Sequence, residues 1–472
     1  MSQTVQGQES ALAACPPLEQ AVVRFILDTH PRDLGPQTRA GVSTLLRDQL
    51  AMQVGSSTLP WSRKILSFAT ERKLPGRSSV IASHLKMSAI DAAFVNAVYG
   101  HGFEYDDAHR ESASHPGSCV VPAAIAIGEE LGKSMDDVIA AIAIGYDVYT
   151  RIGALAAPDL LKRGFHPHAV LANFGAAAVS AKLRGFDGET TLHALAIALS
   201  HASGTTEYTS TGGSIKRVHA GIGTKNGMVA AGLAQAGITG PRAFLSGNKG
   251  FFQTFLQRGP GEAAADRFSS TRQHEVERVW LKPYCCCGCN HAYVDAIRPF
   301  TSRAGEVTEI VAKIQRSANV VVGTANANAY APKNIEHVQY SVPVQMAFAL
   351  LGLGNGYQVH KDYLDGKLDM DKVLATAGRI KLVEAPELDE RYPGKFVADI
   401  TVKFADGRTE HVFVEDPIGT LENRMPEAEQ DSKFMDLTTG VLGQSRAKAL
   451  LSALRELNPR MPVGELVAMC TV

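Results

Sequence analysis

Apolar residues recur with the period of an α-helix through the first half of the chain. After Ser88 they fall at i, i+3, i+4, i+7 and i+8, which places them on one helix face. Ser88 and Ser134 each have an aspartate three residues later, the spacing of a capping pair at a helix N-terminus. Gly132 and Gly185 each follow a periodic segment, as glycines do at helix C-termini. Residues 18–237 are therefore predicted to form a large all-helical domain.

The pattern changes after about residue 281. Strands are predicted where polar and apolar residues alternate, and a hairpin where Asp406-Gly407 separates two of these segments. The predicted strands are residues 306–314, 379–384, 395–404 and 409–414, and helices are predicted at 340–353 and 445–457. The predicted fold is mostly α with an α+β lid. A helical domain covers residues 1–280, a smaller α/β lid domain covers 281–416, and residues 417–472 return to the helical domain.

Composition narrows the class of protein. The chain has 472 residues, of which 45% are hydrophobic and 20% charged, and its formal net charge is -1. Without a basic stripe, nucleic acid and membrane surfaces are not expected partners. The N-terminus lacks the basic and apolar regions of a secretory signal, and no unbroken apolar run is long enough for a transmembrane helix. The seven cysteines do not form a disulfide-like pattern. A soluble, cytoplasmic protein is expected.

The densest group of titratable residues lies between two apolar helical segments, at residues 101–116. It contains four carboxylates and three histidines, among them Glu104, Asp106, Asp107 and His115. One interpretation is a polar loop with a solvated run of charge. The other is an active-site loop, in which burial and mutual charge shift pKa values for proton transfer. The second is favoured because Pro116 breaks the chain and holds His115 near a helix N-terminus, where backbone donors face an anion.

Two further segments place histidines and basic residues at predicted helix starts. His166 and His168 flank Pro167, which favours a rigidly placed donor, although a histidine at a helix start is often only a cap. Lys216 and Arg217 follow a glycine pair, where positive charge opposes the helix dipole. An anionic substrate would explain that cost. The alternative is that Lys216, His219 and Lys225 are ordinary surface charges.

A cysteine-rich segment follows Lys282. Cys286 and Cys289 have the C-x-x-C spacing and His291 is near, so a metal site is one hypothesis. A second C-x-x-C pair is missing from the sequence, and small buried cysteines are the favoured interpretation. Lys282 lies at the predicted domain junction, and clefts between domains are common ligand sites.

Taken in order, these segments resemble the MmgE/PrpD family, which includes 2-methylcitrate dehydratases, cis-aconitate decarboxylases and iminodisuccinate epimerases. The resemblance covers nearly the whole chain and is strongest at residues 94–122, 164–175, 212–232 and 282–297. Two stretches are similar to the decarboxylase-like branch: Gly213-Ser214-Ile215-Lys216-Arg217 and Lys282-Pro283-Tyr284-Cys285-Cys286. One departure is that His115 is followed by Pro-Gly-Ser-Cys, where methylcitrate dehydratases have Pro-Ser-Asp-Asn. Another is that Tyr340 lies one turn before Val344, the position of a tyrosine in some members.

The resemblance implies a homodimer without a cofactor and with a small carboxylate substrate. It aligns the acidic site residue with Glu104 or with Asp106-Asp107, the site histidines with His115 and His166, and the site lysines with Lys216 and Lys282. The expected activity is that of a lyase on a di- or tricarboxylate, either a decarboxylase or a dehydratase. The alternatives are a dicarboxylate epimerase, a metal-dependent hydro-lyase using the cysteine segment, and a catalytically inactive binding protein.

The expected mechanism uses His115 and His166 as general acid and base, because the pKa of histidine lies near working pH. An acidic residue among Glu104, Asp106 and Asp107 orients one of the histidines. The substrate-binding residues are expected to be Lys216, Arg217, Lys282 and Tyr340, with the two lysines holding carboxylates.

Overall fold

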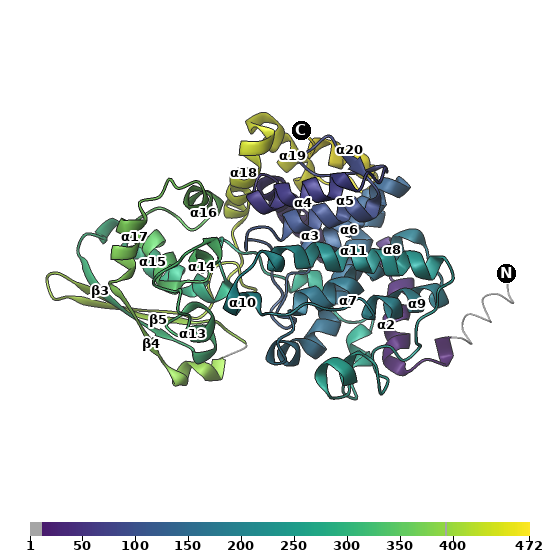
Figure 1. Cartoon of the computed structure of the whole chain (residues 1–472), viewed down its shortest axis with the longest axis horizontal. Coiled ribbons are helices and arrows are strands. Elements are labelled where there is room, and N and C mark those ends of the chain that lie inside the picture. The colour runs from purple at the N-terminus through teal and green to yellow at the C-terminus, as the bar shows by residue number, and fades with distance from the viewer. Residues whose placement is uncertain (1–11, 392–393) are drawn as a thin grey trace. The chain divides into compact units, whose positions relative to one another are not determined.

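The computed structural model describes residues 12–391 and 394–472 and divides the chain into two compact units (Figure 1). Unit 1 contains the described residues up to Gly102, together with Asp106–Val279 and Leu437–Val472. Unit 2 contains Phe103–Tyr105 and Trp280–Asp436. The chain therefore enters unit 2 twice.

Unit 1 is built almost entirely of helices, as predicted. They are α2 (Pro17–Asp28), α3 (Pro36–Ser56), α4 (Pro60–Glu71), α5 (Ala89–Gly100), α6 (Gly117–Leu131), α7 (Met135–Lys162), α8 (Pro167–Arg184), α9 (Gly188–Leu199), α10 (Tyr208–Thr211), α11 (Ile215–Gln235), α19 (Gln444–Arg455) and α20 (Val463–Met469). Shorter helical turns are η1 (Pro31–Asp33), η2 (Phe252–Leu256), η3 (Ala265–Phe268) and η4 (Glu275–Glu277). The prediction of an all-helical domain misses one small feature, because β1 (Ser78–Ser79) and β2 (Lys86–Met87) pair antiparallel.

The helix ends follow the local signals in the sequence. The hydroxyls of Ser88 and Ser134 accept hydrogen bonds from the backbone N–H three residues later, at the starts of α5 and α7. Gly132 and Gly185 end α6 and α8 with φ of 63° and 67°, in the left-handed region that favours glycine. These predictions are confirmed.

Close helix packing places small residues at the contacts. A β-carbon at Gly227 of α11 would lie 2.3 Å from the carbonyl oxygen of Asn173 on α8, so only glycine allows this approach. Helix α7 is long and apolar enough by composition to cross a membrane, which the sequence pattern did not predict. However, 89% of its most apolar window is buried within the structure, as in the core helix of a folded domain.

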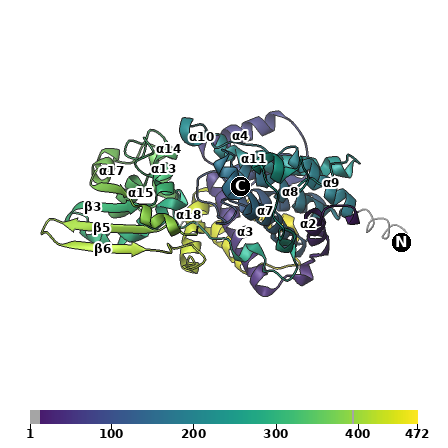
Figure 2. The same cartoon turned by 90° about the horizontal axis from the view of Figure 1, so that it is seen from below.

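Unit 2 contains a mixed sheet with the strand order β4-β3-β5-β6. Its strands are β3 (Val307–Ile314), β4 (Ile380–Glu384), β5 (Ala398–Phe404) and β6 (Thr409–Val414). Strands β3 and β4 are parallel, and β5 and β6 form an antiparallel hairpin with Gly407 at φ of 85° (Figure 2). The strand predictions are confirmed, although β5 begins at Ala398 rather than near residue 395.

Helices cover one face of this sheet. They include α12 (His291–Ile297) and α15 (Val342–Leu350), whose apolar residues share a core with Ile310, Ile400 and Val402 of the strands. The remaining helices are α13 (Arg316–Val322), α14 (Ile335–Gln339), α16 (Tyr357–Leu364) and α17 (Met370–Ala377), with the turns η5 (Gly288–Asn290), η6 (Arg298–Arg303) and η7 (Pro386–Arg391).

The return to unit 1 comes later than the predicted position 417. It falls at Leu437, inside α18 (Glu427–Leu442). The first part of α18 packs within unit 2, where the ammonium of Lys433 donates to the carbonyl oxygen of Tyr105 at 2.7 Å. The backbone N–H of Ile418 likewise donates to Asp295 of the same unit at 2.7 Å. These contacts were not visible in the local pattern of the sequence.

Candidate active site

The segment between α5 and α6 is buried despite its charge. His101 is 2% exposed, His109 is 2% exposed, and Asp106 and Asp107 are fully buried. The hypothesis of a solvated charge run is therefore wrong. Burying this many titratable groups is costly unless they pair with one another, and the pairs that form define the candidate site of unit 1.

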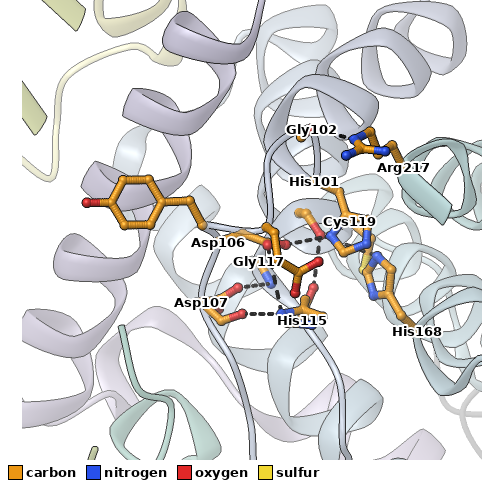
Figure 3. A network of polar contacts seen from close by, with 12 residues as sticks. His101, Gly102, Asp106, Asp107, His115, Gly117, Cys119, His168 and Arg217 are labelled. Atoms are coloured by element: carbon orange, nitrogen blue, oxygen red, sulfur yellow. Dashed lines mark hydrogen bonds and ion pairs between the residues drawn. The ribbon is translucent and has the colours of Figure 1, made fainter. Parts of the chain in front are cut away.

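Asp106 faces two histidines. Its Oδ2 lies 2.7 Å from Nδ1 of His101, and its Oδ1 lies 3.8 Å from Nδ1 of His115. Figure 3 shows the two imidazoles beside this carboxylate, with ring centroids 5.3 Å apart. A carboxylate in this position stabilises an imidazolium when one of the rings takes a proton.

The tautomer of His115 follows from its second contact. Its Nδ1 lies 2.7 Å from the carbonyl oxygen of Asp107, and a carbonyl oxygen can only accept. Nδ1 therefore carries the proton, and in the neutral ring Nε2 carries the lone pair. This is the form in which a histidine can act as a base.

Asp107 has a different role from Asp106. Burial, followed by the neighbouring charge of Asp106, raises the pKa of Asp107 to about 8. Its carboxyl group accepts hydrogen bonds from the hydroxyl of Tyr146 at 2.8 Å and from the N–H of Gly117 at 3.2 Å. Asp107 thus keeps its proton at neutral pH, and Asp106 is the carboxylate that faces the histidines.

Gly117 permits this arrangement at the start of α6. A β-carbon there would lie 2.5 Å from the Tyr146 hydroxyl and 2.8 Å from Oδ1 of Asp107. No ordinary side chain fits such spacing, so the glycine after Pro116 is required for the Asp107 contacts. The sequence showed a chain break here, but not its purpose.

His168, on α8, packs its ring against those of His101 and His115. Its ring lies 4.5 Å from that of His101, its Nδ1 lies 2.7 Å from the hydroxyl of Tyr149, and its Nε2 lies 3.3 Å from that of Ser118. Burial, with the nearby histidines, holds the pKa of His168 well below its usual value. The ring is neutral and bonded at both nitrogens, so it holds the site in place.

His166 occupies the N-cap position of α8, without a side-chain capping hydrogen bond, and its ring meets His219 of α11. Their Nδ1 atoms lie 2.9 Å apart, and both rings are 6% exposed. Tyr208 packs against both, with its ring centroid 5.4 Å from that of His166. The alternative that His219 and Lys216 are surface charges is wrong, because both are buried.

The two basic residues at the start of α11 differ in their contacts. The guanidinium of Arg217 lies 4.1 Å over the ring of Trp61, and its Nε donates to the carbonyl oxygen of Gly102 at 2.9 Å (Figure 3). These contacts anchor the end of the α5 segment. Lys216 is 7% exposed. Its charge, after burial, helps to lower the pKa of His219 to about 4.

The remaining predicted residues form a second cluster, within unit 2. The ammonium of Lys282 donates to Oε1 of Glu104 at 2.8 Å, and the hydroxyl of Tyr340 donates to Oε2 at 3.2 Å. Lys282 is 1% exposed. The backbone of Glu104 has φ of 57°, in the left-handed region. The sequence offered Glu104, Asp106 and Asp107 as equivalents, whereas the structure gives each its own partners.

The cysteine segment lacks the arrangement of a metal site. Across residues 12–391 and 394–472, no group of three or more His, Cys, Asp or Glu side chains could hold a metal ion. Burial raises the pKa of the Cys285 and Cys286 thiols, and it lowers the pKa of His291 to about 3. Because no such group forms among the described residues, this segment does not fit the metal-dependent alternative.

A second buried network in unit 1 holds the same loop. Asp147 and Arg151 of α7 form an ion pair at 2.8 Å, and Asp147 also lies 2.6 Å from Nδ1 of His274. Glu275 lies 3.2 Å from Nε2 of His109, which belongs to the acidic-histidine segment. This network could not be predicted from the sequence, because its contacts join His274 to Asp147 across 127 positions and Glu275 to His109 across 166 positions.

The residues that sequence reasoning missed are histidines. The sequence predicts no role for His101, and it favours His166 over the nearby His168 and Lys216 over the nearby His219. The sequence did point to the right segments, because each of these three histidines lies within five residues of a predicted site residue. The local sequence pattern does not show that the packing of α5, α8 and α11 brings the three histidines near one another.

Comparison with known proteins agrees with this architecture. A family model described as MmgE/PrpD N-terminal domain matches residues 20–262, and one described as MmgE/PrpD C-terminal domain matches residues 284–458. A cis-aconitate decarboxylase of Aspergillus terreus is 28% identical over 451 residues, covering 90% of each chain. A cis-aconitate decarboxylase-like protein of Aspergillus oryzae is 26% identical over 94% of this chain and 95% of its own. A human cis-aconitate decarboxylase is 35% identical over 175 residues, 36% of each chain.

Proposed function

The chain belongs to the MmgE/PrpD family, and from this premise we propose that it is a lyase that acts, without a cofactor, on a small di- or tricarboxylate. The relatives that align along most of its length are cis-aconitate decarboxylases or resemble them, which favours a decarboxylase over a dehydratase. The observation that supports acid–base chemistry most directly is the buried Asp106 carboxylate between the rings of His101 and His115.

The proposed reaction forms a carbanion or enolate beside a substrate carboxylate. In decarboxylation, the electrons of the breaking carbon–carbon bond remain on the substrate as carbon dioxide leaves, and a proton from an imidazolium then neutralises the carbon. In dehydration, an imidazole removes a proton beside the carboxylate, and hydroxide leaves as water after taking a proton from an acid. Both routes need a ring that exchanges one proton and a fixed charge that stabilises the intermediate.

The residues of unit 1 suit these roles. His115 is the proposed proton-transfer group, because the Asp107 carbonyl fixes its tautomer and Asp106 stabilises its charged form. Lys216 is the proposed cation for the developing negative charge. The contacts of Arg217 favour a role in holding the Gly102 backbone rather than the substrate.

The Glu104, Lys282 and Tyr340 cluster has a different proposed role. Lys282 is already paired with Glu104, so replacing that pair with a substrate carboxylate must overcome a buried ion pair. We therefore assign Lys282 to charge balance around Glu104, and Tyr340 to orienting the Glu104 carboxylate. Epimerisation of a dicarboxylate stays the second candidate, since the same intermediate can be reprotonated on its other face.

Proton NMR in heavy water distinguishes these reactions. The protein is incubated separately with cis-aconitate, 2-methylcitrate, citrate and iminodisuccinate. A new vinylic product with carbon dioxide release indicates decarboxylation, and an unsaturated product from a citrate indicates dehydration. Deuterium incorporation without net product indicates epimerisation. Absence of change in all four would contradict the proposed substrate class.

His115→Ala tests the mechanism on whichever substrate reacts. We expect kcat to fall by about a hundredfold or more, the usual contribution of a general acid or base. His84→Ala, at an exposed histidine of unit 1, is the control and should retain activity. Full turnover by His115→Ala would refute the proposed role.

A further inference from the structure

His166 and His219 meet in a way that allows only one proton between them. Their Nδ1 atoms are 2.9 Å apart, the distance of a hydrogen bond between nitrogens. If both nitrogens carried a proton, two hydrogens would point at each other. If neither did, two lone pairs would repel. One ring must therefore donate from Nδ1 and the other must accept.

This contact fixes what each ring offers at its other nitrogen. The accepting ring has a bare Nδ1, so its Nε2 carries a hydrogen whether the pair is neutral or singly charged. The donating ring keeps its Nδ1 hydrogen, so its Nε2 is the atom that can gain or lose a proton. Only the donating ring can then act as an acid or base while the contact lasts.

The surrounding charges indicate which of the two rings donates the hydrogen bond and which accepts it. His219 lies one turn after Lys216 on α11, and that positive charge disfavours an imidazolium at His219. Burial lowers the pKa of His166, and His219 and His115 lower it further, but the Asp106 carboxylate acts in the opposite direction and favours a charged ring. The other groups that face the pair are Tyr208 on α10, His101 at the end of α5, and His168 on α8.

We propose that His219 is a positioning residue that accepts a hydrogen bond from Nδ1 of His166 and so reserves Nε2 of His166 for proton transfer. His219 itself stays neutral in the Nε2–H tautomer. Burial is consistent with a neutral resting pair, because it lowers the pKa of both rings. The value of this arrangement to turnover rests on the proposed function, whereas the tautomer assignment does not.

Two substitutions at one position separate the proposed contact from general packing. In His219→Asn the side-chain oxygen can occupy the place of Nδ1 and accept from His166. In His219→Gln the longer side chain puts its amide at the place of Nε2, so the place of Nδ1 is left empty. We expect kcat to fall by about 10- to 100-fold in His219→Gln, with a smaller change in KM, and to recover by about tenfold in His219→Asn. The acid limb of the kcat profile against pH should move in the glutamine variant alone.

Nitrogen NMR of the full chain, with ring-labelled histidine, tests the tautomer without any substrate. We expect His166 to show a protonated Nδ1 and a bare Nε2 at neutral pH, and to lose this preference in His219→Gln. The control is His193→Asn on α9, a histidine whose Nδ1 accepts from the N–H of Gly240 at 3.2 Å. It should leave the His166 signals unchanged.

Two results would overturn the proposal. One is an unchanged His166 tautomer in His219→Gln, and the other is equal loss of activity in the glutamine and asparagine variants. If the tautomer behaves as expected but none of the carboxylates reacts, the positioning contact stands and the proposed function fails.

Discussion

Neighbouring residues of one type can have opposite roles when their partners differ. Asp106 and Asp107 are adjacent in sequence and both fully buried, yet Asp106 faces imidazoles while Asp107 faces a tyrosine hydroxyl and a backbone N–H. Burial and the neighbouring charge of Asp106 raise the pKa of Asp107. The two adjacent aspartates are therefore not equivalent.

The raised pKa of Asp107 predicts how stability depends on pH. Its pKa is about 8 in the folded state and near 4 when unfolded. Between these values the folded state binds the extra proton, so this group reduces the free energy of unfolding progressively as pH rises from 4 to 8. Asp107→Asn removes the titration. The variant should gain stability relative to the parent as pH rises from 5 to 7, by at most about 3 kcal/mol.

Urea unfolding of both proteins at the two pH values measures this difference. Tyr146→Phe serves as a companion, because it removes the O–H that stabilises the Asp107 carboxylate and should raise the pKa further. A stability difference between parent and Asp107→Asn that does not change with pH would contradict the assignment of the proton.

At the scale of the element, α7 connects two polar networks through opposite faces. Tyr146 and Tyr149 contact Asp107 and His168 of the candidate site, while Asp147 and Arg151 contact His274 and Gln273. These four side chains of α7 are all fully buried. An apolar helix of this length therefore carries polar groups on both sides, and each has a partner.

Arg151 is the residue of α7 whose loss should cost most. Its guanidinium is fully buried, pairs with Asp147 and stacks 4.6 Å over the ring of Phe25. Arg151→Met keeps the volume but leaves the charge of Asp147 with less compensation. We expect the free energy of unfolding to fall by about 3 kcal/mol, as when one partner of a buried pair is removed.

A double-mutant cycle checks that prediction by urea unfolding. Adding Asp147→Asn to Arg151→Met should recover part of the loss, because both charges are then gone. If the two substitutions are additive, the ion pair is not the source of the stability.

At the scale of the whole molecule, the chemistry of the cysteine segment bears on metal dependence. Among the described residues, its cysteines and His291 belong to no group of three or more side chains that could hold a metal ion. We expect that dialysis of the active protein against EDTA leaves turnover within about twofold of its starting value, the control being dialysis without chelator. Stoichiometric zinc or iron in the purified protein, lost together with activity, would contradict this.

The sequence predicted the elements well because their signals are local. The caps at Ser88 and Ser134, the left-handed glycines and the Asp406-Gly407 hairpin each depend on residues a few positions apart. The roles of the candidate site residues stay a prediction, and their pairing could not be read from the sequence. The His166–His219 contact spans 53 positions and the Glu104–Lys282 contact spans 178. Such contacts depend on how helices pack, which periodicity does not encode.

The placement of Phe103–Tyr105 in unit 2 has a consequence for how the protein is made. These residues leave the ribosome early, but their partners Lys282, Gln339 and Lys433 come much later. At about 5–20 residues per second, the delay is on the order of tens of seconds. During synthesis, the Glu104 carboxylate therefore cannot pair with Lys282 until that later residue has been translated. The order of translation makes this short segment one of the last parts of the chain to reach its final environment.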